Sequence, residues 1–140
     1  AYGFRHVLVM EVAYGQVPRA LRAERHRRAA AWLDGLPGGF TAGLRTRHRL
    51  RAAALARMTG AADPDQLAAV RRDLDEHDRP GRFDQAMAVA EAVLAEPAGE
   101  GTRDLELAAR ACRDRILRDR AHAAAAVQAA GGVLTGESEA

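Results

Sequence analysis

Proline and glycine divide this chain into segments that are otherwise rich in alanine, leucine and arginine, and this pattern constrains the fold more than any other feature. Alanine, leucine and arginine are strong helix formers, whereas strands favour β-branched and aromatic residues. Aromatic residues make up only 4% of the chain, and Ile116 is its one isoleucine. Apart from a possible extended stretch over 1–5, no alternating strand pattern occurs in the sequence. The sequence therefore predicts an all-α fold.

The positions of the breaks predict a right-handed stack of about six or seven helices. Proline fits the first position of a helix and glycine fits its end, which sets most of the boundaries. We expect helices over 7–14, 18–36 and 44–58, one from Pro64 to the break at Pro80–Gly81, one from Phe83 to near Pro97, and one capped by Thr102. The run 121–130 either extends this last helix or forms another, and Gly131–Gly132 is expected to end it.

Large apolar residues at helical spacing predict the core. The expected core positions are Leu21, Trp32, Leu33, Leu36, Phe83, Leu105 and Cys112. The face formed by Trp32, Leu33 and Leu36 is expected to dock on neighbouring helices. The helix pairs around Pro80 and Gly99 have roughly the length of tetratricopeptide units, although they lack the full signature of that repeat.

Missing residue types exclude several kinds of chemistry. All 21 basic residues are arginine, so the chain has no lysine for a phosphate-binding P-loop, a Schiff base or a protein-kinase site. Serine occurs only at Ser138, which argues against a serine hydrolase, and a lone cysteine forms no internal disulfide or cysteine-based zinc site. No histidine has another four residues away. We therefore expect no enzyme activity, no bound metal and no cofactor held by this chain alone.

The net charge of +2 hides an asymmetry along the chain. Residues 1–60 contain 11 arginines against three acids, whereas residues 61–140 contain 10 arginines against 16 acids. The basic front is either a nucleic-acid surface or a set of solvated helix faces complementary to the acidic back, and the second interpretation is favoured. The cluster Asp73, Asp75, Glu76 and Asp78 lacks the spacing of a calcium loop and is expected to be a solvated face.

Two stretches near the start of the chain carry a motif. The first reads Phe4-Arg5-His6, Leu8-Val9, Glu11 and Ala13-Tyr14, and the second reads Arg25-His26, Ala29-Ala30 and Trp32-Leu33. Together they resemble the winged-helix end of the STAND-type, AAA-like ATPase module of bacterial transcriptional regulators and cyclase-fused regulators, which leads into tetratricopeptide repeats. The match covers residues 2–36, with a looser likeness to the repeat helices over 84–117. Met10 departs from the family pattern, and no P-loop occurs in this sequence.

The resemblance implies a role in nucleotide sensing for His6 with Phe4 and Arg5, because the aromatic-x-His of that family lies beside the bound nucleotide. A histidine just ahead of a helix would also lie near an anion-binding helix N-terminus. ATP or ADP is expected only in the context of an upstream ATPase domain, of which this chain would be one segment or a remnant.

The resulting domain prediction has four parts. Residues 1–37 form the winged-helix-like end of the module, 38–43 a linker, 44–132 a helical, tetratricopeptide-like bundle and 133–140 a flexible tail. The predicted function is a non-catalytic regulatory or protein-interaction segment of a signal-transduction ATPase or transcriptional regulator.

The alternative is a DNA-binding winged-helix fragment, because arginines supply phosphate contacts. Its candidate residues are Arg22, Arg25, Arg27 and Arg28. The expected partner is a protein, with DNA less favoured. No apolar run approaches the length of a membrane span and no secretory leader is recognisable, so no membrane contact and a cytoplasmic location are expected.

Overall fold

A computed structural model describes residues 2–37, 39–77, 81–96, 99 and 101–138, with side chains also left out at 2–7, 77 and 133–138. All regular secondary structure in the described part is α-helix, which confirms the predicted all-α class, although neither a tetratricopeptide array nor a winged helix follows from it. Six helices occur in these ranges: α1 (Tyr2–Gln16), α2 (Arg19–Asp34), α3 (Ala42–Met58), α4 (Pro64–His77), α5 (Phe83–Ala95) and α6 (Arg103–Ser138). Within the same ranges, no helix is both long and apolar enough to cross a membrane.

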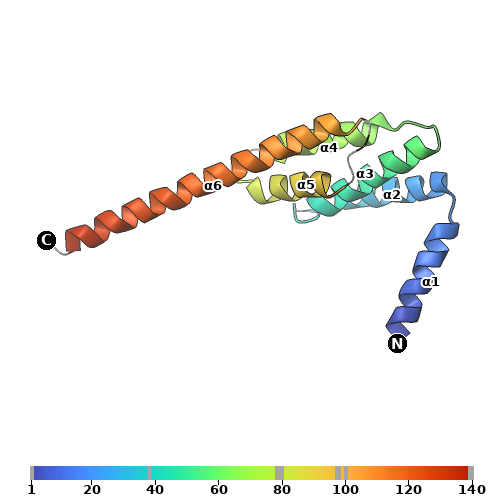
Figure 1. Ribbon diagram of the computed structural model, residues 1–140, viewed down its shortest axis with the longest axis horizontal. Helices are drawn as coiled ribbons and strands as arrows, with labels where there is room; N and C mark the ends of the chain where they lie inside the picture. Colours follow the sequence, from blue (N-terminus) through green and yellow to red (C-terminus); the bar gives the residue numbers. More distant parts are fainter. Residues whose placement is uncertain (1, 38, 78–80, 97–98, 100, 139–140) are drawn as a thin grey trace.

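The body of the molecule is built around α3. Helix α3 packs most extensively against α2, and on its other sides against α4 and α5, while α6 covers α5 and touches α4 (Figure 1). The main core draws on four helices through Leu50, Val70, Val89, Ile116 and their neighbours. Of the predicted linker 38–43, residues 39–41 lie in the turn before α3, Ala42 and Gly43 are the first two residues of α3, and residue 38 lies outside the described residues.

Two helices leave this body (Figure 1). Helix α1 runs off at an angle after Gln16 and packs along no other helix in the described part of the chain. Helix α6 continues well past the bundle, and every residue from Leu117 to Gly132 is exposed. At a rise of 1.5 Å per residue, its 36 residues span about 54 Å.

The glycine pair Gly131–Gly132 does not end α6, so that prediction is wrong, and the run 121–130 extends the helix through this pair to Ser138. A glycine inside a helix costs only about 1 kcal/mol relative to alanine, and the preceding alanine run has the highest helix propensity available. The predicted tail 133–140 is thus helical in backbone as far as Ser138.

Two predicted core residues of α2 are exposed instead. Leu21 retains 46% and Trp32 68% of its accessible surface, whereas Leu33 is buried. The buried residues of α2 are Ala23, His26, Ala30 and Leu33. At 3.6 residues per turn, Leu21 and Trp32 lie about half a turn from that stripe. Two alanines therefore form much of the buried stripe of α2, together with His26 and Leu33, while Leu21 and Trp32 face solvent.

The other predicted core positions lie in or beside the core. Leu105 and Cys112 are buried in α6, Phe83 is half-buried against the main core, and Leu36 is half-buried just after α2. The expected docking face of Trp32, Leu33 and Leu36 is therefore divided between core and solvent.

Candidate functional site

The predicted nucleotide-sensing residues Phe4, Arg5 and His6 lie in α1, and their side chains are outside the described residues. Their helix begins at Tyr2 rather than at Val7, so the expected start of the helix is wrong. His6 is the fifth residue of this helix, beyond the first four N–H groups that lack a partner within a helix. The position of its backbone therefore differs from that of a residue just ahead of a helix.

A hydrogen-bonded chain of three rings links α1, α2 and α3. The hydroxyl of Tyr14 lies 2.9 Å from Nε2 of His26, and Nδ1 of His26 lies 2.9 Å from Nδ1 of His48. The two imidazole rings are tilted with their centroids 5.1 Å apart, and Tyr14 meets His26 edge to face. The two histidines are 22 residues apart in sequence and meet because α2 and α3 pack side by side. A search for histidines spaced along a single helix does not find such a pair.

Burial and neighbouring cations both lower the pKa values of the two histidines. His26 keeps only 9% of its accessible surface. Its pKa is lowered from the usual 6.5 mainly by burial and then by His48, Arg51 and Arg22. The pKa of His48 is also lowered, mainly by burial and then by Arg51 and Arg47. Both shifts favour the neutral form of the rings, in which one nitrogen donates and the other accepts a hydrogen bond.

The four arginines proposed for DNA binding differ in their surroundings. Arg27 donates to Asp63 at 2.6 Å and to Glu24 at 2.9 Å, and Arg28 donates to the same Glu24 at 3.2 Å. The hydrogen bonds from Arg27 and Arg28 lower the pKa of Glu24. The hydrogen bond to Asp63 is the main cause of a raised pKa for Arg27.

The remaining two arginines of that set are Arg22 and Arg25. The guanidinium of Arg22 lies over the ring of Tyr14, 5.0 Å from its centroid, and its Nε is buried without a hydrogen-bond partner. Arg25 is exposed. Three of the four predicted residues thus contact other groups of this chain.

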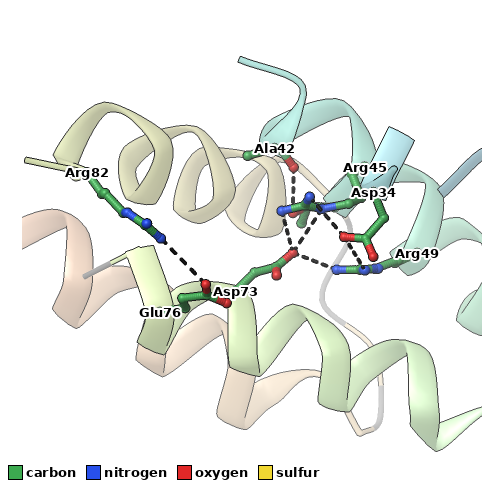
Figure 2. A network of polar contacts seen from close by, with 8 residues as sticks. Asp34, Ala42, Arg45, Arg49, Asp73, Glu76 and Arg82 are labelled. Atoms are coloured by element: carbon green, nitrogen blue, oxygen red, sulfur yellow. Dashed lines mark hydrogen bonds and ion pairs between the residues drawn. The ribbon is translucent and has the colours of Figure 1, made fainter. Parts of the chain in front are cut away.

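A second polar cluster joins α2, α3 and α4 (Figure 2). Asp73 of α4 accepts hydrogen bonds from Arg45 at 3.2 Å and from Arg49 at 2.6 Å. Asp34, at the end of α2, contacts the same two arginines. The side chains of Asp73, Arg45 and Arg49 are only 11–12% exposed. This cluster ties three helices together through charge-assisted hydrogen bonds.

The interpretation of Asp73 as part of a solvated face is therefore wrong. Asp75 and Glu76 are exposed as expected, and Glu76 contacts Arg82 (Figure 2), whereas Asp78 lies outside the described residues. One signal was present in the sequence: Arg45 and Arg49 are four residues apart and share a helix face, which is suited to holding one carboxylate between them.

A hollow lies between α3, α4, α5 and α6. It encloses about 300 Å³ and is lined mainly by apolar side chains, with Arg57, Glu96 and Glu106 among its walls. Its apolar lining includes Leu50, Ala53, Met58, Leu67 and Val93. Over the described residues, no group of three or more His, Cys, Asp or Glu side chains is arranged to hold a metal ion.

Comparison with protein-family models, with curated proteins and with solved structures finds no match for this chain.

Proposed function

We propose that this chain is a non-catalytic regulatory or protein-interaction segment of a cytoplasmic signal-transduction ATPase or transcriptional regulator. The observation that carries the interaction role is the apolar surface of α1. Leu8, Val9, Met10 and Val12 are all exposed, between 43% and 66%, on a helix that packs along no other described helix. Exposed apolar side chains on a helix that contacts the body only near its end favour a helix-in-groove contact with another protein surface.

The assignment to an ATPase or a transcriptional regulator depends on the motif resemblance of residues 2–36. The arginine contacts favour the protein-interaction role over the DNA-binding alternative. Arg27 and Arg28 share Glu24, and Arg27 also binds Asp63, so their guanidiniums are partly neutralised within the chain. Phosphate contacts to DNA would compete with these pairs.

The test compares two valines of α1 with one valine of α6. We expect the paired change Val9→Asp and Val12→Asp to reduce capture of a protein partner from cell extract at least about tenfold, because each places a charge in an apolar contact. Val127→Asp is the matched control, since Val127 is exposed to 72% on the projecting part of α6. The captured protein is then purified, and its affinity for the wild-type chain, the paired α1 variant and the Val127→Asp variant is measured by calorimetry.

Two results would contradict the proposal. One is loss of binding to the purified partner in the Val127→Asp variant but not in the paired α1 variant. The other is retardation of duplex DNA that weakens steeply with salt and disappears when Arg25, Arg27 and Arg28 are changed to glutamate, which would support the DNA-binding alternative. Stabilisation by ATP that is lost in His6→Ala would instead restore a nucleotide-sensing role.

A further inference from the structure

Four side chains form a straight row along the outer face of α2. The row consists of Leu21, Arg25, Arg28 and Trp32, all of which are exposed. Their spacing of four, three and four residues places them within about 60° of arc, on the side of the helix opposite its buried stripe. Helix α3 is the only described helix against which α2 packs extensively. We propose that this row, named the Trp32 row, binds an acidic amphipathic helix of another protein.

The two ends of the Trp32 row are apolar. Leu21 and Trp32 lie 11 residues apart, which at a rise of 1.5 Å per residue is about 16 Å. Trp32 is the only tryptophan of the chain, and burial of its neighbour Leu33 leaves the larger indole in solvent. Tryptophan is among the residue types that contribute most to binding between proteins. The two ends are therefore suited to anchor a partner at two points.

The middle of the row decides the charge of the partner. A helix that contacts both Leu21 and Trp32 also covers Arg25 and Arg28, which lie between them. A guanidinium keeps its charge when it is covered, and an unpaired charge withdrawn from water is strongly destabilising. Arg28 already pairs with Glu24 at 3.2 Å, whereas Arg25 has no ion pair or hydrogen bond with any described residue. The partner must therefore supply carboxylates opposite the row.

The remaining charges of α2 also favour an acidic partner. The helix contains five arginines against Glu24 and Asp34, so positive charge prevails along it. Asp34 contacts Arg45 and Arg49 of α3, which leaves less negative charge to face a partner. Complementary charge speeds encounter with an acidic surface and disfavours a basic one.

A helix is the partner shape that the row fits. The four side chains follow the axis of α2, so a second helix packed alongside contacts all of them. The spacing is the same in both directions along the chain. A helix with apolar residues at two ends and carboxylates at the two inner positions therefore matches the row in either orientation. Duplex DNA would pair with the arginines, but its phosphates offer no apolar surface to Leu21 and Trp32.

Fluorescence of the full chain tests the proposal, because Trp32 is the only tryptophan. The probe is an alanine-rich helical peptide of about 20 residues, in which two leucines flank two glutamates at the same spacing of four, three and four. The matched control peptide carries lysines in place of the glutamates. We expect the glutamate peptide to shift the emission of Trp32 to shorter wavelength in a saturable way. The lysine peptide should bind at least about tenfold more weakly.

Variants of the chain locate the contact. Leu21→Asp and Arg25→Glu should each weaken binding of the glutamate peptide at least about tenfold, and the paired change Arg25→Glu and Arg28→Glu should reverse the preference toward the lysine peptide. Leu117→Asp and Arg118→Glu, both on the exposed part of α6, are the matched controls and should leave binding unchanged. All of these positions are exposed, and circular dichroism verifies that each variant is folded.

Several outcomes would overturn the proposal. They are absence of binding, equal affinity for the two peptides, and binding detected by calorimetry that leaves the emission of Trp32 unchanged. Emission that shifts to longer wavelength when the chain alone is diluted would make a second copy the occupant. Displacement of the glutamate peptide by duplex DNA, lost in Arg25→Glu, would assign the row to nucleic acid.

The α1 surface supplies a further control. The paired change Val9→Asp and Val12→Asp should leave binding of the glutamate peptide unchanged, because these residues lie on α1. The Trp32 row and the proposed function can therefore fail independently. Loss of peptide binding in that paired variant would show that the peptide occupies α1 instead of α2.

Discussion

Replacement of Asp73 by alanine is expected to lower the free energy of unfolding by about 3 kcal/mol, because it leaves two buried guanidiniums without their central carboxylate. Arg45 and Arg49 are each only 11% exposed, and neither can lose its charge by deprotonation. Asp34 still contacts both arginines, but it is 58% exposed and binds from the solvent side. The decrease in the free energy of unfolding should therefore be large, although Asp34 still compensates part of the charge of the two arginines.

Urea unfolding followed by circular dichroism measures this effect, with Asp75→Ala as the matched control. Asp75 lies two residues further along α4, is 68% exposed and forms a surface pair with Arg71 at 3.5 Å. Such pairs contribute about 0.5 kcal/mol or less. Equal decreases in the free energy of unfolding for Asp73→Ala and Asp75→Ala would show that Asp73 does not hold the three helices together.

Truncation of Ile116 to alanine is expected to have an effect of similar size for a different reason. Ile116 is fully buried where α6 meets the core, and the change removes three buried carbon atoms and leaves a cavity. Substitutions of this kind cost about 2–5 kcal/mol. The same unfolding measurement should therefore show a marked decrease in the midpoint of denaturation.

The next residue supplies the control for this prediction. Leu117 is 51% exposed, so Leu117→Ala removes little buried surface and should change stability by less than about 0.5 kcal/mol. If the two variants proved equally stable, α6 would not be anchored through Ile116 as described. If Leu117→Ala alone were destabilising, the buried face of α6 would be centred on Leu117 rather than on Ile116.

Local features of the sequence predict much of the secondary structure. The low content of β-branched and aromatic residues predicts the all-α class, and Pro64 begins α4 as expected for a proline at a first helical position. Phe83 begins α5 as predicted. These signals act within a few residues of the boundary that they set, so they can be read without knowledge of the fold.

Features that depend on contacts between helices could not be predicted in this way. Periodicity showed that α2 has apolar residues, but the alanine-lined contact with α3 decides that Leu21 and Trp32 face solvent. The meeting of His26 with His48, and of Asp73 with two arginines, depends on how α2, α3 and α4 are placed side by side. Composition and spacing contain little information on such placement.

The projecting half of α6 implies that this protein does not melt as one unit. Beyond Arg120, which binds Asp84 of α5, the helix has exposed side chains through Gly132 and no core to lose. Isolated helices of this length are marginally stable in water and unwind gradually from their ends. Heating should therefore first give a shallow, sloping decrease in ellipticity from this segment, and only later the sharp sigmoidal transition of the packed bundle.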